Sequence, residues 1–338
     1  MSKQFLAIPF FIIFVSAIII FPSCRRQGAP ERRIAEQDQN GLSIPVPEFD
    51  EDSAFAFIEK QVAFGYRVPN TPAHRQTAAW LAETLGRFTD TLIVQHARVR
   101  ASNGDVLAIQ NIIGSFDVGN PRRVLLVAHW DTRPWADHDP DPANHWRPFA
   151  GANDGGSGTA VLLEIARQIA MAEQRPQVGI DIILFDAEDY GEHHSVSGRV
   201  EDSWGLGSQH WARNPHIRGY TALYGINLCM VGAYDARFLH EGFSKRYAAG
   251  VIRKVWQLAH QLGYGEFFPN KEGGFIINDH YYVNTILNIP TINVIHQERN
   301  GTHGFFRYWH TMKDDLPIIS KPVLRAVGQT VLATVYAE

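Results

Sequence analysis

The sequence contains few cysteines and no excess of basic residues, and both absences limit its function. Only Cys24 and Cys229 occur among its 338 residues. If the segment ending at Cys24 is processed, Cys229 stands alone and no intramolecular disulfide can form. The 31 basic and 35 acidic side chains give a formal net charge of -4 at pH 7. Because this balance of charges gives no net positive potential to attract a polyanion, we expect no nucleic-acid partner.

Internal repeats and long apolar runs are also lacking, except near the N-terminus. Lys3 precedes an apolar stretch from Phe5 to Phe21, and Pro22-Ser23-Cys24 follows at once. This order is typical of a secretory signal, and a Cys behind a small residue resembles a bacterial lipoprotein cleavage site. We predict a lipoprotein-type signal peptide over residues 1–24 and lipidation of Cys24. An uncleaved membrane helix is the alternative, although about 17 apolar residues is at the short limit for spanning.

The chain after Cys24 divides into a tether and one folded domain. Residues 25–43 are polar, charged and without hydrophobic period, and we predict a flexible tether over residues 25–48. Residues 49–338 are long enough for one large α/β domain with a substantial core. The tether and the lipid would hold this domain at the membrane of a bacterial cell envelope, exposed to the periplasm or the cell surface. We expect a monomer.

Periodic apolar residues predict the secondary structure of the domain. Runs rich in Ile, Val and Leu predict buried strands at residues 107–114, 124–129, 180–186, 221–230 and 291–295. Helical spacing and capping signals predict helices from Asp52, from Thr71-Pro72, and over residues 157–172, 208–214, 245–262 and 317–337. The alternation indicates an α/β fold with a mixed, mostly parallel central β-sheet flanked by helices on both faces. Ligands of such sheets bind beyond the carboxyl ends of the strands.

Four polar segments that follow apolar runs together predict a zinc site. They are His129-Trp130-Asp131, Asn153-Asp154-Gly155-Gly156, Glu188-Asp189 and Trp309-His310. A catalytic zinc keeps three oxygen or nitrogen ligands from the protein and one open position. Asp154, Asp189 and His310 would supply the three ligands, and Glu188 would be the acid/base. Two adjacent acids after an apolar run are unfavourable unless a cation shares their site.

Each segment also has a structural alternative. Asp154 could cap the helix that begins near residue 157. The two acids could be a hydrogen-bonded strand end, and Trp309-His310 a packed aromatic strand end. The acidic loop at residues 135–141 could be a further metal site, but a solvated loop or pocket rim is favoured. His193 and His194 are expected to be exposed.

The motifs resemble those of the zinc-dependent aminopeptidase and glutaminyl cyclase family, and most closely those of bacterial glutaminyl cyclases. The resemblance runs from Phe64-Gly65-Tyr66-Arg67-Val68-Pro69 through residues 129–134 and 204–208 to Tyr308-Trp309-His310-Thr311. It implies zinc ligation by Asp154, Asp189 and His310. It also implies a catalytic role for Glu188, a pocket wall made by Trp309, and less certain roles for Asp279 and the Trp204 region.

Two positions depart from the family pattern, and two others have alternative roles. In aminopeptidases of the family the position of His129 binds a second zinc while Asp131 orients it, whereas in the cyclases that His binds no second metal. Cys229 and Asn278 stand where the family normally has acids. A thiolate at Cys229 could still bind zinc, and a buried inert thiol is the alternative. The absence of these two acids weakens the two-metal hypothesis most. It also weakens the cyclase hypothesis, for which reduced or altered activity is the alternative.

The resemblance therefore implies a single-zinc glutaminyl-peptide cyclotransferase. Such an enzyme converts the N-terminal glutamine of peptides or proteins into pyroglutamate and releases ammonia. One zinc ion is expected and two are possible. A two-zinc aminopeptidase is the first alternative, and a catalytically silent peptide-binding lipoprotein is the second.

Overall fold

A single mixed sheet organises the residues that the computed structural model describes, which are 44–196, 200–298 and 304–338. Its strand order is β1-β2-β4-β3-β5-β6. The bounds are β1 Thr91–Arg100, β2 Val106–Phe116, β3 Arg123–His129, β4 Gly179–Phe185, β5 Tyr224–Cys229 and β6 Thr291–Ile295. Strands β3 to β6 are parallel, and β1 and β2 form an antiparallel edge. The predicted mixed, mostly parallel sheet is confirmed.

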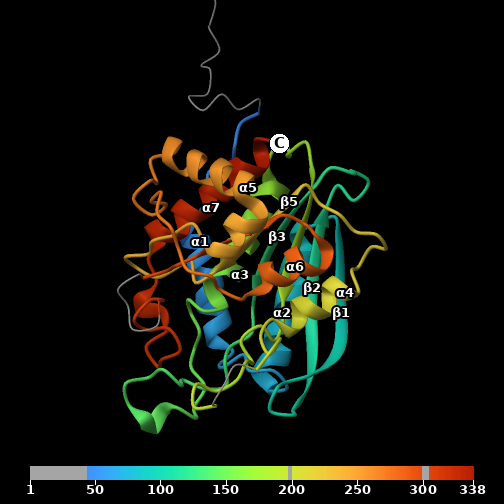
Figure 1. Ribbon diagram of the computed structural model, residues 1–338. Coiled ribbons are helices and arrows are strands. Elements are labelled where there is room, and N and C mark those ends of the chain that lie inside the picture. Colours follow the sequence, from blue (N-terminus) through green and yellow to red (C-terminus); the bar gives the residue numbers. More distant parts are fainter. Residues whose placement is uncertain (1–43, 197–199, 299–303) are drawn as a thin grey trace, which may run out of the picture. The chain divides into compact units, whose positions relative to one another are not determined.

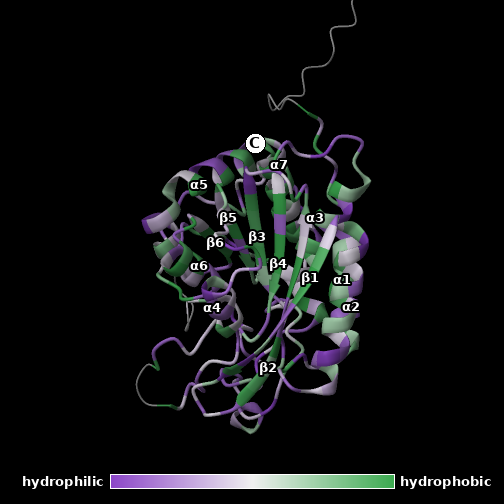
Figure 2. Cartoon of the chain, turned by 90° about the vertical axis from the view of Figure 1, so that its right-hand side faces the viewer, coloured by the Kyte–Doolittle hydropathy of each residue, from purple (hydrophilic) through white to green (hydrophobic). Residues whose placement is uncertain are grey.

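Helices cover both faces of this sheet (Figure 1). They are α1 Glu51–Ala63, α2 Pro72–Phe88, α3 Gly156–Met171, α4 Leu206–Arg213, α5 Gly242–Gln261, α6 Asp279–Leu287 and α7 Lys321–Tyr336, with short 3-10 turns at Pro142–Asn144 and Leu316–Ile318. Helices α4 and α6 contribute to a smaller core on one face. The larger core on the other face contains α1, α2, α3, α5 and α7. Figure 2 shows α4 and α6 on the opposite side of the sheet from α1 and α2.

The central strands are apolar on both faces because both cores enclose them. Every residue of β3 and β4 is buried, and these strands are strongly hydrophobic in Figure 2. Leu126 and Ala128 face the larger core, whereas Leu125 and Val127 face the smaller one. Parallel pairing places the carboxyl ends of these strands at one edge of the sheet. The polar segments that follow β3, β4 and β5 therefore emerge close together.

The predicted elements are largely confirmed, with differences at their ends. Asp50, and not Asp52, caps α1, because the Asp50 carboxylate accepts the amide N–H groups of Asp52 and Ser53. Helix α7 begins at Lys321, after the short turn at Leu316–Ile318. Strand β1 and helix α6 were not predicted. β1 has mostly exposed or half-buried residues and lies at the sheet edge, so it lacks the apolar run that indicates a central strand.

The predicted signal segment, with Cys24, and most of the tether at 25–48 lie outside the described residues. Ile44 and Val46 already pack against the larger core, ahead of the predicted domain boundary at residue 49. None of the helices in the described part of the chain is both long and apolar enough to cross a membrane.

Candidate metal centre and active site

Asp154, Asp189 and His310 converge from three separate loops. Asp154 lies in the turn before α3, Asp189 follows β4, and His310 lies between β6 and α7. One ligand atom from each lies within 4.8 Å of the others. His310 Nε2 is 3.1 Å from Asp189 Oδ1 and 3.5 Å from Asp154 Oδ2. The structure thus brings together the three side chains predicted to bind zinc.

A tight turn aims the Asp154 carboxylate into the site. The amide N–H groups of Asn153 and Asp154 donate to the two carboxylate oxygens of Asp314, at 2.7 and 3.0 Å. Gly155 has φ +84°, and a Cβ there would lie 2.4 Å from the Asp131 carbonyl oxygen. Gly155 is also the N-cap residue of α3, which has no side-chain cap. The alternative role of Asp154 as the helix cap is therefore excluded.

Asp131 positions the two adjacent acids after β4. Its Oδ1 accepts the Glu188 amide N–H at 3.0 Å, and its Oδ2 accepts the Asp189 amide N–H at 3.1 Å. Ala187, just before them, has a left-handed φ of 51°. Asp131 Oδ1 also lies 3.4 Å from His129 Nδ1. One buried carboxylate therefore sets the backbone from which Glu188 and Asp189 enter the site.

The electrostatics of Asp189 favour a bound cation. No donor among the described residues meets its buried carboxylate oxygens in hydrogen-bonding geometry, and its nearest cationic partner is His310, whose Nε2 lies 3.1 Å from Oδ1. Burial raises the pKa of Asp189, and the nearby Asp154 carboxylate adds to that rise. Burial alone would lower the pKa of His310, but the surrounding carboxylates, Asp189 first among them, raise it to about 10. Two carboxylates and one imidazole around a common point fit the ligand preference of zinc, and a divalent cation would offset the repulsion between the acids.

Asp137 is buried next to His310, whereas a solvated loop or pocket rim was predicted for its segment. Asp137 is 2% exposed, and its Oδ1 lies 3.4 Å from His310 Nδ1. Arg133 holds both Asp137 oxygens, through Nε at 2.9 Å and Nη2 at 2.7 Å. A carboxylate at the second imidazole nitrogen fixes the tautomer and orientation of a ligating His. The predicted solvation is wrong for Asp137 and equally for Asp139, which is buried because it accepts hydrogen bonds within its own loop and from Met312.

The two neighbouring histidines differ in exposure. His193 is buried, against the prediction, because its ring stacks on Trp146 with 4.0 Å between centroids and its Nδ1 lies 2.8 Å from Ser195 Oγ. His194 is exposed, as predicted.

Glu188 faces the same pocket and is almost completely buried. Asn278 Nδ2 donates to its Oε1 at 2.9 Å. Burial raises the pKa of Glu188 well above its ordinary value, and the carboxylates of Asp279 and Asp189 raise it further against the opposing effect of His129. A carboxyl group in such surroundings can carry a proton near neutral pH, which suits an acid/base.

Aromatic rings form much of the remaining pocket wall. The rings of Trp309 and His310 stack at 3.8 Å between centroids, and Trp204 lies parallel to the same imidazole at 6.1 Å. The pocket has a volume of about 50 Å³ and is also lined by Asn278, Ile276 and other residues. Asp279 is not among its lining residues, because it lies buried at the first position of α6 while Asn278 faces the acids.

A second potential ligand group shares Asp154. His129 Nε2 lies 3.2 Å from Asp154 Oδ1, and Cys229 Sγ lies 3.7 Å from the same imidazole nitrogen. Ligand atoms of these three residues fall within 4.8 Å of one another. Burial raises the pKa of the Cys229 thiol, which opposes formation of a thiolate. Asn278 Nδ2 lies 3.6 Å from the sulfur.

Sequence reasoning missed three buried residues that hold the site together. Asp137 and Asp314 support His310 and the Asp154 turn, as described above. Arg67 is fully buried and donates to the carbonyl oxygens of Trp130, Ala150 and Gly151. Arg67 lies in a family motif, but a single sequence carries no signal that separates Asp137 or Asp314 from an ordinary solvated acid.

Known proteins share this architecture. The chain is similar to a Zn-dependent exopeptidase from Parabacteroides distasonis, with 51% identity and a TM-score of 0.85 over 87% of this chain and 100% of that one. The chain is also similar to a glutaminyl cyclase from Tannerella forsythia, with 50% identity and a TM-score of 0.84 over 86% of this chain and 100% of that one.

A curated sequence relative is more distant. It is the glutaminyl-peptide cyclotransferase of Boiga irregularis, 23% identical over 65% of this chain, and the match spans 62% of that protein. Residues 111–335, which include the metal group, Glu188 and both departures at 229 and 278, match the peptidase family M28. The chain therefore belongs to peptidase family M28.

Proposed function

We propose that this protein is a single-zinc glutaminyl-peptide cyclotransferase, which converts the N-terminal glutamine of peptides into pyroglutamate. The observation that carries the proposal is the inequality of the two candidate ligand groups that share Asp154. The group of Asp154, Asp189 and His310 offers two carboxylates. The group of His129, Asp154 and Cys229 offers no carboxylate of its own, whereas a two-metal hydrolase needs anionic ligands on both ions. The similarity to a glutaminyl cyclase supports the same conclusion.

Zinc held by Asp154, Asp189 and His310 would supply a Lewis acid for the side-chain carbonyl group of the substrate glutamine. Glu188 takes a proton from the substrate α-amine while that nitrogen forms a bond to the side-chain carbonyl carbon. The C–N bond of the side-chain amide then breaks, and Glu188 returns the proton to the departing ammonia. Asn278 holds Glu188 Oε1, which leaves Oε2 for this transfer. Trp309 and Trp204 exclude water and pack against the substrate.

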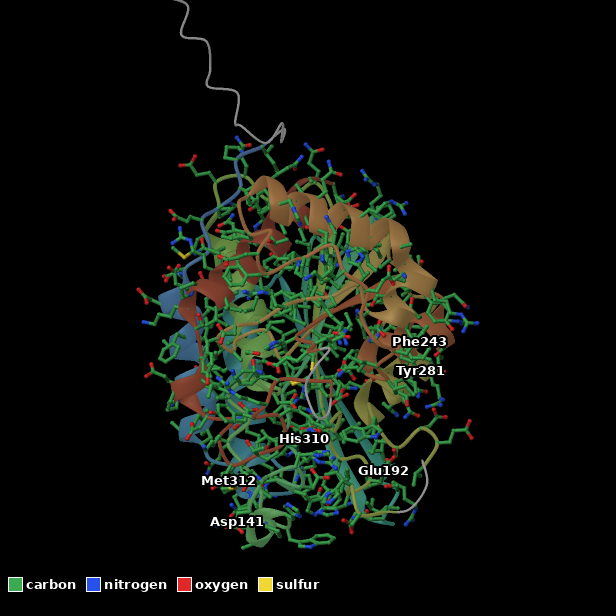
Figure 3. The ribbon with its side chains drawn as sticks, turned by 60° about the vertical axis from the view of Figure 1, so that its left-hand side comes forward. Asp141, Glu192, Phe243, Tyr281, His310 and Met312 are labelled. Carbon is green, nitrogen blue, oxygen red and sulfur yellow. The ribbon has the colours of Figure 1, made fainter. Side chains whose placement is uncertain are left out.

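The role of Glu188 is tested by Glu188→Gln. The variant is expected to keep zinc, because Glu188 is not in the ligand group, and to lose roughly 10²–10⁴-fold in kcat. Ammonia release from a glutamine-initiated peptide and zinc content by elemental analysis measure the two properties. Glu192→Gln is the matched control, since Glu192 follows closely in sequence but does not line the pocket. His310 and Glu192 are labelled in Figure 3. Full activity of Glu188→Gln would reject this proposal.

A two-zinc aminopeptidase is the second candidate. The proximity of His129, Asp154 and Cys229 favours it, as does the similarity to a Zn-dependent exopeptidase. Incubation of zinc-loaded protein with a glutamine-initiated peptide and a leucine-initiated peptide separates the two activities. Two zinc ions per chain with release of whole residues would favour hydrolysis. One zinc with loss of ammonia would favour cyclisation, and peptide binding without turnover would favour a silent peptide-binding protein.

We also propose that the domain is a monomer anchored to the cell envelope through a lipid on Cys24. The support is the apolar segment followed by Ser23-Cys24. The Cys24→Ala variant of the full chain is expected to lose incorporation of labelled fatty acid and to leave the membrane fraction. Unchanged labelling would exclude this anchor.

A further inference from the structure

A groove of about 420 Å³ lies beside the active-site pocket and is not used by the proposed chemistry. It is lined by Gly273, Gly274, Phe275, Ile276, Gln297 and Phe305, among others. Ile276 and Phe305 also line the pocket that contains Glu188 and the metal ligands. The two cavities are therefore adjacent. The small pocket has room for little beyond a single side chain, so the rest of a peptide substrate must lie outside it.

Gln297 lines this groove and carries a hydrogen-bond donor that has no partner among the described residues. The residue is 5% exposed. Its Oε1 accepts the Gly274 amide N–H at 2.8 Å, which identifies the other amide atom as Nε2. Within the described part of the chain, Nε2 is buried and has no hydrogen-bond partner. A buried unpaired donor is costly, and the carbonyl oxygen of a bound peptide is the complementary acceptor.

The backbone opposite Gln297 is shaped for close approach. A Cβ at Gly273 would lie 2.7 Å from Gln297 Oε1 and 2.9 Å from Nε2. Any side chain at position 273 would therefore displace the amide group of Gln297. Glycine at this position keeps the Gln297 donor in place at the groove.

Phe275 is an exposed aromatic side chain that packs against a neighbouring ring. It is 69% exposed, yet its ring packs against Phe243 at 5.0 Å between centroids. Phe243 in turn contacts Tyr281 at 4.7 Å, and Figure 3 shows these two residues next to each other. A Cβ at Gly242 would lie 2.6 Å from the Phe275 ring. A prearranged aromatic surface binds an apolar side chain at low entropic cost.

We propose that this groove binds the substrate residues that follow the N-terminal glutamine. Gln297 Nε2 donates to a main-chain carbonyl oxygen of the peptide, and Phe275 packs against an apolar or aromatic side chain at the second or third position. Glu298 also lines the groove, so acidic side chains are disfavoured there. This inference rests on the proposed function, because it assigns the peptide preference of that same site.

The preference is tested with the tetrapeptides Gln-Ala-Ala-Ala, Gln-Phe-Ala-Ala, Gln-Ala-Phe-Ala and Gln-Ala-Glu-Ala. For the wild-type protein, one of the two Phe peptides is expected to have a kcat/KM about fivefold above that of the alanine peptide, as partial burial of one aromatic side chain implies. The Phe275→Ala variant is expected to remove this advantage and to leave the alanine peptide within about twofold. Met171→Ala is the control, because Met171 is also 69% exposed but lies at the end of α3, away from both cavities.

The Gln297 donor is tested by Gln297→Glu, which keeps an oxygen acceptor for the Gly274 amide and replaces the donor by a second acceptor. The variant is expected to lose about tenfold in kcat/KM on the tetrapeptides, the cost of leaving one buried polar group unpaired. The dipeptide amide Gln-Ala-NH₂, which offers fewer downstream carbonyl groups, should lose much less. If the variant does not fold, as judged by its thermal melting curve and zinc content, Phe275→Ala decides the question.

Two different failures can be told apart. If the wild-type protein cyclises all tetrapeptides at equal rates, or if Phe275→Ala keeps the aromatic preference, the groove assignment is overturned while the proposed function stands. If no peptide releases ammonia, the proposed function fails, and calorimetric titration with the same peptides then tests the groove. Tighter binding of a Phe peptide that is lost in Phe275→Ala supports the groove under that outcome, and absence of binding overturns it.

Discussion

Glu241 and Asp189 are both buried carboxylates, yet they differ in the number of backbone and hydroxyl donors around them. Glu241 caps α5 and accepts hydrogen bonds from the amide N–H groups of Phe243, Ser244 and Ile276 and from the Ser244 hydroxyl group. His280 Nε2 lies 3.0 Å from it. Asp189 has no backbone or hydroxyl donor among the described residues, and its nearest partners are His310 Nε2 at 3.1 Å and Arg133 Nη1 at 3.9 Å. Burial raises the pKa of both, but His280 and Ser244 lower that of Glu241 to about 2, whereas the pKa of Asp189 stays raised.

The difference separates an acid that stabilises the fold from one that serves a site. A buried carboxylate with a full set of donors is compensated by the protein itself. One that faces another acid without donors is compensated only by a proton or a cation. By this criterion Asp189, beside Asp154 and His310, is suited to hold a cation, whereas Glu241 is already compensated by its donors.

The largest effect is expected for Asp189→Asn. Under the proposed function, loss of this charge removes one of three zinc ligands, so zinc content should fall to near zero and kcat/KM should fall by on the order of 10³-fold. Elemental analysis and ammonia release check both. Glu241→Gln is the matched control, because it neutralises an equally buried acid and should keep its zinc. Zinc retained by Asp189→Asn, or lost equally by Glu241→Gln, would break the comparison.

A smaller effect is expected for Asp137→Asn. The substitution weakens the contact that orients His310, and zinc affinity should fall about 10–100-fold while the site can still be filled at high zinc concentration. Competition with a chelator measures the affinity. Asp139→Asn is the control, since Asp139 is a buried acid of the same loop that accepts hydrogen bonds from Asp141, Asn144 and Met312. Equal zinc affinities in the two variants would show that the contact with His310 does not orient the ligand.

Glu241→Gln should alter stability much more than activity. The folded-state pKa of Glu241, about 2, lies below the ordinary value of 4.5. Its contribution to the free energy of unfolding is therefore fully present above about pH 5 and is lost as the pH falls through about 2. The substitution should cost about 2–4 kcal/mol at pH 7 and flatten the acid limb of the stability curve. Urea unfolding from pH 7 to pH 2.5 measures this, and an unchanged acid limb would contradict the assigned compensation.

The smallest effect is expected for Cys229→Ser. A thiol that binds no metal can be replaced by a hydroxyl group with zinc content unchanged and kcat/KM within about twofold. Cys229→Asp is the informative partner, because it gives the group of His129 and Asp154 an acid of its own and should raise the bound zinc above one per chain. A loss of zinc on Cys229→Ser would instead show that the thiol is already a ligand.

The comparison also explains which parts of the site could be predicted. Asp154, Glu188, Asp189 and His310 stand out because each follows an apolar strand or a marked turn, where an isolated acid or imidazole is unexpected. Asp137 and Asp314 lie in polar loops, and their burial depends on Arg133 and on the Asp154 turn. No local pattern distinguishes such residues from solvated acids. The same holds for Gln297, whose importance lies in an unpaired nitrogen beside a groove.

The secondary structure shows the same division. Strand β6, Thr291–Ile295, was predicted with its observed bounds because it is a short, fully buried apolar run. Strand β1 was missed because the edge of a sheet requires no continuous apolar run. Helix α6, Asp279–Leu287, was missed because its apolar and polar residues are less clearly separated on two faces than those of α4, which is as short but was predicted.

The sequence by itself determined the buried strands, the α/β order of the elements and the polar segments at the strand ends, because hydrophobic burial leaves a periodic pattern in the chain. Only the tertiary structure decided which carboxylates are compensated by protein donors and which are left for a cation. That distinction depends on distances between loops far apart in the sequence, and no local pattern records them.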